Sequence, residues 1–400
     1  MDTGAAKFPL MPAARRQRIA YPPPMEQSDP TPVEDPVTAG NRLTIDLSAL
    51  ARNWQALDRM AAGSETAAAV KGNAYGIGLE PAVRSLAGAG CRTFFVALPD
   101  EGERTRAVAT DATIYVLNGL ARDLASVHAR HGLRPVIGST GELDDWAAYR
   151  AQGGAGQAAL HVDTGMNRLG LTFDEARALA ADPQAVARLG LSLVMSHLAC
   201  ADTPEHPLSA RQLAAMRDVK ELFPGLSVSL ANTAGIALDP AYHFDLVRPG
   251  IGLYGGPFIA GRPPLDTVVT AEARIIQIRD VPAGETVGYG AAATTRRQSR
   301  IAILSTGYAD GYHRAAGSTD QRRGADVALH GRRAPLFGRI SMDLMAIDVT
   351  DVPEAGRGDW VELFGPAMPV AEVAEAAGTI SYEFLTSLGS RYRRRYIGAA

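Results

Sequence analysis

Short apolar runs that alternate with helix-patterned stretches occupy residues 67–250, and they limit the folds open to this chain. We count eight runs, each of the length of a buried strand. They are AAAVKGN (67–73), TFFVAL (93–98), ATIYVLNG (112–119), RPVIGS (134–139), AALHVDTG (158–165), LSLVMSHL (191–198), LSVSLANT (226–233) and FDLVRPG (244–250). Eight strand–helix units within about 200 residues predict a (β/α)8 TIM barrel. A doubly wound open sheet is the structural alternative.

The sequence changes character on both sides of this region. Residues 1–40 mix Pro, Ala, Arg and acidic residues without a hydrophobic period, which predicts a flexible extension. From Asn41 a short strand is expected to run into an amphipathic helix. After residue 265 strand-like segments are joined by Pro and Gly turns, which is typical of a β domain. We therefore predict an α/β plus β protein, with a TIM-barrel domain at 41–265 and a mainly β C-terminal domain at 266–400.

Composition narrows the possible classes of function. The chain is 46% hydrophobic and 21% charged, which is typical of a globular protein. Its formal net charge of -3 provides no basic surface for nucleic acid. We find no run of about 18 apolar residues and no signal-peptide pattern, so neither a membrane span nor export is expected. Cys91 and Cys200 form no CxxC pair, which predicts buried free thiols and a cytoplasmic protein.

The barrel prediction also indicates where the chemistry lies, because active sites of such barrels form at the carboxyl ends of the strands. The residues of interest at those ends are Lys71, Asp163, Arg168, His197, Asn232, Thr233, Arg248, Gly250 and Ile251. A glycine after the eighth strand lets backbone N–H groups approach an anion, and a hydroxyl after the seventh strand adds a donor. We therefore expect a ligand that bears a phosphate group.

Lys71 adds a second property to that ligand. At the end of an apolar strand its pKa should fall, which favours the neutral amine that forms Schiff bases. Pyridoxal phosphate needs both such an amine and an anion site, so the two features together favour this cofactor. The alternative is a lysine that only extends its charged end into water.

Two other patterns are weaker. The segment RPGIGLYGG (248–256) contains GxGxxG, but no helix-forming stretch follows, which disfavours dinucleotide binding. His197, Asp202 and His206 lack the spacing of a recognised metal site and are interpreted as hydrogen-bonded loop residues. We expect no catalytic metal.

A series of motifs in a fixed order extends from Asn41 to the C-terminus. They are AAAVKGNAYGIG, HVDTGMNRLG, MSHLACAD, ANTAGI, RPGIGLYG, VGYGAAAT, TGYADGYHR, GRISMDLMAIDVT, GDWVELFG and ISYEFLTSLGSRYRRRY. Together they resemble the alanine racemase family, whose members join a TIM barrel to a β domain and use pyridoxal phosphate. The resemblance implies a racemase that depends on this cofactor.

The resemblance also implies two acid/base residues. Lys71 would hold the cofactor as a Schiff base and exchange a proton on one face of the substrate. Tyr289, supplied by the partner subunit, would act on the opposite face. Racemisation needs both faces, because one base on one face returns the same enantiomer. A β-domain tyrosine without a catalytic role is the alternative for Tyr289.

Cofactor contacts follow from the same resemblance. Arg248 is expected at the pyridine nitrogen, which its guanidinium keeps unprotonated. His197 would link Arg248 towards Tyr289. The residues expected around the phosphate are Tyr75, Asn232, Thr233, Gly250, Ile251 and Tyr382.

Substrate contacts implied by the resemblance come from both subunits. Arg168 would reach the phenolic oxygen of the cofactor and the substrate carboxylate. The backbone N–H of Met342 would complete the carboxylate site, and Tyr308 would narrow the entrance, both from the partner subunit. The implied active species is therefore a head-to-tail homodimer.

The chain departs from the family pattern at three positions. His161 stands where many members carry a lysine, often carbamylated, and an imidazole cannot supply the negative charge of a carbamate. Thr233 stands where serine is common and keeps the hydroxyl. Ser341 precedes Met342 where cysteine is frequent, which should change sensitivity to thiol reagents rather than catalysis.

The leading functional prediction is interconversion of L- and D-alanine, which supplies D-alanine for peptidoglycan or for D-alanine catabolism. A racemase of broader specificity, for serine, lysine or arginine, is the first alternative. A non-catalytic protein that binds pyridoxal phosphate is the second. A decarboxylase is disfavoured because it would pair the pyridine nitrogen with an acidic residue, whereas Arg248 is basic.

Overall fold

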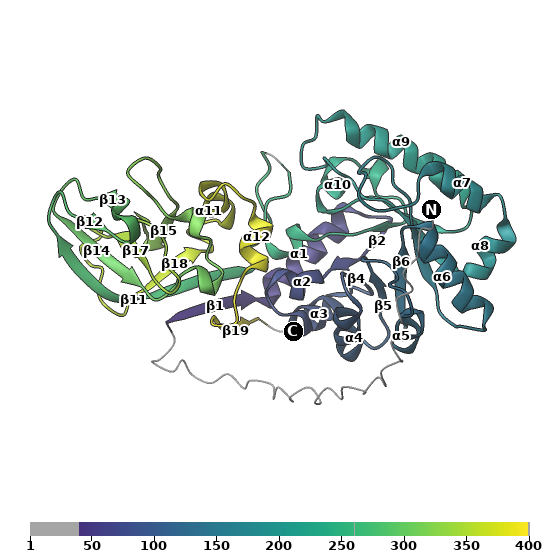
Figure 1. Ribbon diagram of the computed structural model, residues 1–400, viewed down its shortest axis with the longest axis horizontal. Helices are drawn as coiled ribbons and strands as arrows, with labels where there is room; N and C mark the ends of the chain where they lie inside the picture. Colours follow the sequence, from purple (N-terminus) through teal and green to yellow (C-terminus); the bar gives the residue numbers. More distant parts are fainter. Residues whose placement is uncertain (1–39, 260, 399–400) are drawn as a thin grey trace, which may run out of the picture. The chain divides into compact units, whose positions relative to one another are not determined.

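The computed structural model describes residues 40–259 and 261–398 (Figure 1). The predicted flexible extension, except its last residue, lies outside the described residues. Within them, the longest helix has 16 residues, which is short of the roughly 20 apolar residues that a membrane span requires.

A closed barrel of parallel strands confirms the predicted fold of the N-terminal region. Seven strands follow the order β3-β4-β5-β6-β7-β8-β9 in one sheet, and β10 pairs in parallel with β2. The bounds are β2 Glu65–Thr66, β3 Ala68–Ala69, β4 Thr93–Val96, β5 Thr113–Val116, β6 Leu133–Ile137, β7 Ala158–His161, β8 Leu191–Met195, β9 Ser227–Ser229 and β10 Leu246–Val247. A bridge between Asn232 and Arg248 joins the ends of β9 and β10 and closes the circle.

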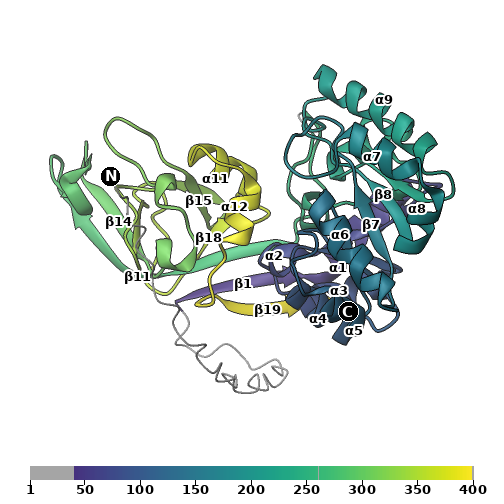
Figure 2. The same ribbon diagram turned by 45° about the vertical axis from the view of Figure 1, so that its right-hand side comes forward.

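Helices cover the outside of the barrel, as Figures 1 and 2 show. They are α1 Leu47–Met60, α2 Lys71–Tyr75, α3 Leu79–Ala89, α4 Pro99–Val108, α5 Ala125–Arg130, α6 Thr140–Ala151, α7 Phe173–Ala180, α8 Pro183–Leu189, α9 Pro207–Leu222 and α10 Thr233–Leu238. Local sequence fixes several of their starts. The Ser139 side chain accepts the Glu142 N–H at the start of α6, and Thr172 forms a capping box with Glu175 at the start of α7.

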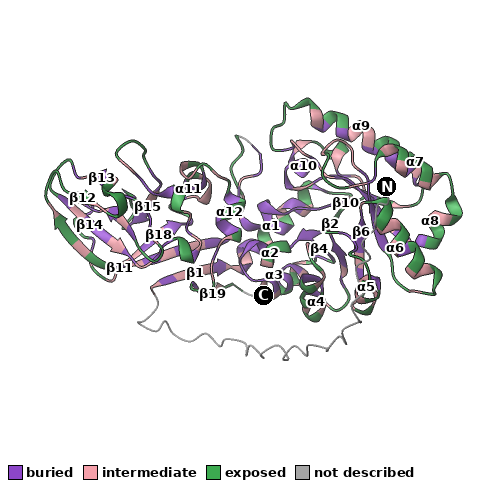
Figure 3. Cartoon of the chain, viewed as in Figure 1, coloured by how far each residue is buried: buried purple, intermediate pink, exposed green. Residues whose placement is uncertain are grey.

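The barrel interior is filled by side chains. Its cluster comprises Ala67, Ala69, Phe95, Tyr115, Val136, Ala159, Leu193, Met195 and Leu246. The strands are buried on both faces, whereas the outer faces of the surrounding helices are exposed (Figure 3). The centre of the barrel is therefore a packed core, and ligands are left with its rim.

The C-terminal region is mainly β, as predicted. Its sheet has the order β16-β15-β18-β11-β1-β19, with β14 and β17 joined to it through β11. The bounds are β1 Asn41–Asp46, β11 Val269–Val281, β14 Ser299–Leu304, β15 Asp326–Leu329, β16 Arg332–Pro335, β17 Met345–Asp348, β18 Trp360–Phe364 and β19 Arg393–Ile397. A short hairpin, β12 Thr286–Val287 with β13 Ala293–Thr294, and two helices, α11 Val370–Ala376 and α12 Ser381–Thr386, complete the region.

The first strand, β1, pairs with strands of the C-terminal sheet, whereas the sequence analysis grouped residues 41–46 with the barrel domain. In the structure β1 pairs antiparallel with β11 and parallel with β19, so it belongs to the C-terminal sheet. The alternation of its buried and half-buried residues fits a strand at either place, and only the long-range pairing decides. The domain limits themselves stay a prediction.

The two cysteines differ in burial. Cys91 is buried, and burial raises the pKa of its thiol to about 12, which makes it inert. Cys200 is only half-buried, contrary to the prediction of two buried thiols.

Candidate active site

Lys71 lies two residues after β3, past the carboxyl end of the first barrel strand, where the sequence predicted it. The backbone that follows turns left-handed, with φ of 64° at Gly72, 55° at Asn73, 53° at Ala74 and 52° at Tyr75. Only glycine adopts this conformation without steric cost, so three consecutive side-chain-bearing residues are strained here. Such strain persists only where surrounding contacts hold it, which is common at functional sites.

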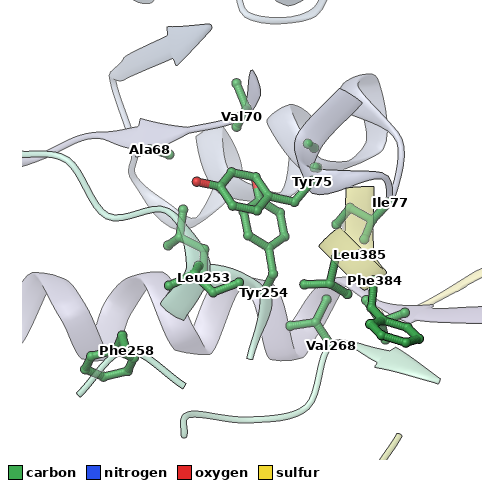
Figure 4. Packing of buried hydrophobic residues seen from close by; sticks show 14 of the residues in the cluster. Ala68, Val70, Tyr75, Ile77, Leu253, Tyr254, Phe258, Val268, Phe384 and Leu385 are labelled. Carbon is green, nitrogen blue, oxygen red and sulfur yellow. The ribbon is translucent and has the colours of Figure 1, made fainter. Parts of the chain in front are cut away.

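Tyr75 forms one wall of the predicted phosphate site. Its buried ring stacks on Tyr254 at a centroid distance of 4.4 Å, and Figure 4 shows the two rings packed face to face below Val70. The Tyr254 hydroxyl donates to the carbonyl of Ala69 at 2.9 Å, which anchors the pair to β3. A Cβ on Gly250 would lie 2.3 Å from the Tyr75 hydroxyl oxygen, so only glycine fits there.

The seventh and eighth strands supply the rest of this wall. Thr233 is buried and accepts the Gly250 N–H on its hydroxyl oxygen at 2.7 Å. Asn232 caps α10 by accepting the Gly235 N–H at 2.9 Å. Ile251 follows Gly250 and is buried. The predicted residues after these strands are therefore brought together around Gly250.

Tyr382 reaches the same place from α12. Its ring centroid lies 5.9 Å from that of Tyr75, and the side chain stays partly exposed. Burial raises the pKa of its hydroxyl to about 12, with a smaller contribution from Asp202, so it is a neutral hydrogen-bond donor. The C-terminal region thus contributes one residue to the barrel rim of its own chain.

Arg248 is a buried cation held by neutral groups. Its guanidinium donates to the carbonyls of Ser196 at 2.6 Å and Leu230 at 3.3 Å, and to the hydroxyl oxygen of Ser229. In the described part of the chain no carboxylate forms an ion pair with it. Burial lowers the pKa of Arg248 to about 9, so the group stays charged at neutral pH. An apolar side chain also lies near the cation, because the centroid of the Phe95 ring is 5.8 Å from the guanidinium carbon of Arg248.

Two histidines adjoin this cation. The Nδ1 atom of His197 lies 3.4 Å from an Arg248 nitrogen, which brings together two residues that the sequence analysis linked. Burial, and then the charge of Arg248, holds the pKa of His197 well below its ordinary value. His161 is buried at the end of β7, where burial, again followed by Arg248, lowers its pKa to about 4. Both imidazoles are therefore neutral at pH 7.

Positive charge collects at the rim. Lys71 is exposed as a residue, but the protein atoms around its amine desolvate it and lower its pKa. The charges of Arg168 and Arg248 lower it further, while Glu101 opposes them. Among the described residues, neither Lys71 nor Arg168 makes a side-chain hydrogen bond or close ion pair. An amine with a lowered pKa is available as a nucleophile, and Arg168 is free to bind an anionic ligand.

Three predicted site residues lie elsewhere in the chain. Tyr289, Tyr308 and Met342 are 73%, 42% and 54% exposed, respectively. The Met342 carbonyl accepts the Ala309 N–H at 3.0 Å, which places the Tyr308 and Met342 segments side by side. Tyr289 lies between β12 and β13, which Figure 1 shows at the far end of the sheet from α2. Within the described chain no hydrogen bond, ion pair or ring contact joins any of the three side chains to Lys71, Arg168 or Arg248.

The sequence analysis missed three residues that support the rim. Tyr254 stacks on Tyr75, and the Ser229 hydroxyl accepts a hydrogen bond from Arg248. Glu101 accepts the Asn73 N–H at 3.1 Å. Ser229 carried a usable signal, because it is a polar residue at the end of a strand, two residues before ANTAGI. The other two carried none, since their partners lie far away in the sequence.

The residues present fit pyridoxal phosphate. Lys71 lies at the rim, and neutral hydroxyls together with Gly250 form one wall. The buried Arg248 guanidinium has no carboxylate partner among the residues that the structure describes. No group of three or more His, Cys, Asp or Glu side chains in the described ranges could hold a metal ion, and the absence of a catalytic metal stays a prediction. Fold and site together define a barrel protein of the class that uses pyridoxal phosphate.

Comparison with known proteins gives the family. The model of the alanine racemase N-terminal domain matches residues 45–257, and that of the alanine racemase C-terminal domain matches residues 268–396. The chain belongs to the alanine racemase family and is an enzyme of the racemase class.

Individual relatives align over nearly their whole length. The chain is 47% identical to an alanine racemase of Rhizobium meliloti over 91% of this chain and 98% of the relative. It is 48% identical to a biosynthetic alanine racemase of Agrobacterium fabrum, over 90% and 94% respectively. The crystal structure of alanine racemase from Bartonella henselae, with covalently bound pyridoxal phosphate, matches with a TM-score of 0.85 and 39% identity, covering 90% of this chain and 100% of that one.

Proposed function

We propose that this enzyme interconverts L- and D-alanine with pyridoxal phosphate bound to Lys71. The observation that carries the proposal is a lysine with a lowered pKa on the same barrel rim as a buried arginine that has no carboxylate partner within residues 40–259 and 261–398. Full-length similarity to alanine racemases supports the choice of substrate.

The protein groups would divide the work as follows. When bound, pyridoxal phosphate withdraws electrons and makes the α-hydrogen of an attached amino acid acidic. The Lys71 Nζ would take or return that proton on one face, and the Tyr289 hydroxyl would do so on the other. A lowered lysine pKa favours this role, because the amine must be neutral to accept a proton.

Binding would be shared among the remaining rim residues. Tyr75, Asn232, Thr233, Gly250, Ile251 and Tyr382 would surround the phosphate. Arg248, backed by His197, would face the pyridine nitrogen, and its lasting charge would leave that nitrogen unprotonated. Arg168 would pair with the substrate carboxylate, since it has no other partner among the described residues.

Completion of this site would require a second copy of the chain. Tyr289, Tyr308 and Met342 are exposed and lie apart from the Lys71 rim of their own subunit. In a head-to-tail homodimer the partner's Tyr289, Tyr308 and Met342 would complete each rim, with Tyr308 narrowing the entrance and the Met342 N–H binding carboxylate. We further propose that the dimer works in the cytoplasm and supplies D-alanine for peptidoglycan or for catabolism.

The test combines spectrum and turnover on the purified enzyme. We expect a visible absorbance band from covalently bound cofactor, and racemisation of both L- and D-alanine in a chiral assay. Serine, lysine and arginine, assayed in parallel, measure substrate breadth. The proposal is wrong if the band is present and neither isomer of alanine is converted, and faster conversion of another amino acid would assign the broader racemase.

A further inference from the structure

Glu101 is a buried carboxylate beside the predicted site that the proposed mechanism does not use. It keeps 8% of its surface exposed and lies in the first turn of α4. Its two oxygens have separate partners. Oε2 accepts the N–H groups of Ala97 at 2.9 Å and Leu98 at 3.4 Å, whereas Oε1 accepts the N–H of Asn73 at 3.1 Å.

The two sets of bonds serve different elements. The bonds from Ala97 and Leu98 cap the start of α4, and side chains at this position cap many helices in the same way. The bond from Asn73 crosses to another barrel unit and reaches the strained left-handed turn. A carboxylate is a stronger acceptor than a neutral oxygen, so this bond is well suited to hold a backbone that would otherwise relax.

The turn carries two residues of the predicted site. Lys71 lies two positions before Asn73, and Tyr75 lies two positions after it. The other side of Asn73 is also fixed, because its side-chain oxygen accepts the Leu79 N–H at 3.1 Å and an N–H of Arg104 at 3.1 Å. The turn is therefore held at the Asn73 backbone by Glu101 and at the Asn73 side chain by Leu79 and Arg104, and both Glu101 and Arg104 lie on α4.

We propose that Glu101 is a positioning residue that fixes the left-handed turn and thereby places Lys71 and Tyr75 for cofactor binding. The proposal rests on the proposed function, since it takes Lys71 and Tyr75 as cofactor contacts. Glu101 also acts on the Lys71 amine through its charge. It raises the Lys71 pKa, whereas desolvation and the charges of Arg168 and Arg248 lower it, so the proposal rests on the bond to the turn and not on this charge.

The substitution Glu101→Gln separates the two roles. The amide oxygen can replace Oε2, which receives two N–H groups, and the amide NH2 then faces the Asn73 N–H, which also donates. The cap of α4 is kept while the contact to the turn is lost. Glu103→Gln is the matched control, because Glu103 lies on the same helix, is exposed and, among the described residues, makes only a long polar contact to His131.

We expect Glu101→Gln to bind pyridoxal phosphate about tenfold or more weakly in a titration of the visible band. At saturating cofactor, kcat for alanine should fall by a similar factor while KM changes little, because Arg168 is untouched. The thermal midpoint of the cofactor-free protein should stay close to that of the wild type. Glu103→Gln should match the wild type in all three measurements.

The result that would overturn the proposal is a Glu101→Gln enzyme with wild-type cofactor affinity and kcat. A Glu101→Gln enzyme that loses cofactor only because its cofactor-free form unfolds would also contradict the proposal. In that case Glu101→Asp, which keeps the charge, would not restore cofactor affinity. Failure of the proposed function is a separate outcome. It would show as a wild-type enzyme that does not racemise alanine.

Discussion

At the scale of single residues, Arg248 is a buried cation whose hydrogen-bond partners are neutral groups. A buried guanidinium is normally paired with a carboxylate, because an isolated buried charge is costly. Here two backbone carbonyls and a serine hydroxyl satisfy it instead. Under the proposed function its remaining donor capacity would serve the pyridine nitrogen. In the described part of the chain no acidic side chain pairs with Arg248, so no carboxylate there offsets its charge.

Ser229→Ala tests how much this support contributes. The Ser229 hydroxyl donates to the Leu246 carbonyl at 2.6 Å and accepts from Arg248, so alanine leaves a charged donor unsatisfied in the core. We expect a loss of about 2 to 3 kcal/mol in the free energy of unfolding, measured by urea denaturation. Ser85→Ala is the control, because Ser85 is buried and bonds only the neutral Leu47 carbonyl. It should cost about 1 kcal/mol, and equal losses would refute the special role of the charge.

His161 should make stability depend on pH. Its folded pKa of about 4 lies below the ordinary value of 6.5, so between these values the unfolded chain binds a proton that the folded chain does not. Stability is therefore complete above pH 6.5 and falls as the pH decreases towards 4, by up to about 3 kcal/mol for this residue. Urea denaturation at pH 7 and pH 4.5 should show a smaller difference in His161→Gln than in the wild type. An unchanged difference would contradict the assignment.

At the scale of elements, the loops after the barrel strands converge because parallel strands end at one rim. Gly250 tests how tightly they meet. Gly250→Ala would place a methyl group 2.3 Å from the Tyr75 hydroxyl oxygen, so we expect cofactor affinity to fall about tenfold or more in an absorbance titration.

Gly141→Ala provides the opposite case. Gly141 lies in the first turn of α6, and a Cβ there meets open space. Alanine should raise the free energy of unfolding by up to about 1 kcal/mol and leave cofactor affinity unchanged. If Gly250→Ala and Gly141→Ala lower the affinity for the cofactor equally, the effect at Gly250 does not come from a clash with the Tyr75 hydroxyl.

The same scale separates what the sequence predicts from what it does not. Lys71, Thr233 and Arg248 were found because strand ends in a barrel share a rim, which is a rule about position. Glu101 was not found, since it acts through a bond to Asn73, 28 residues away, and its local pattern indicates only a helix cap. The pairing of β1 with the C-terminal sheet could not be predicted for a related reason. It depends on long-range contacts, such as that between Asn41 and Ala273.

At the scale of the whole molecule, the proposed dimer predicts complementation. Lys71→Ala and Tyr289→Phe should each be nearly inactive. If each site takes Lys71 from one subunit and Tyr289 from the other, a mixed dimer holds one site with both changes and one intact site. Random mixing of equal amounts should then restore about a quarter of wild-type activity.

Differently tagged variants, refolded together and purified through both tags, provide the measurement. The mixed dimers should recover activity, whereas a mixture that was never allowed to exchange subunits should not. Mixed dimers that form and stay inactive would contradict a shared site and would place both bases within one chain.

The central claim, that two bases act on opposite faces of alanine, is tested most directly by converting L-alanine in deuterated water. Early in the reaction we predict that the D-alanine product carries deuterium at Cα while the recovered L-alanine keeps its hydrogen. One base removes the original proton of L-alanine, and the other base delivers deuterium from the solvent to the opposite face. Each inverted molecule therefore carries deuterium at Cα. Product D-alanine that retains the original hydrogen would contradict the account, because a single base would then have carried the proton from one face to the other.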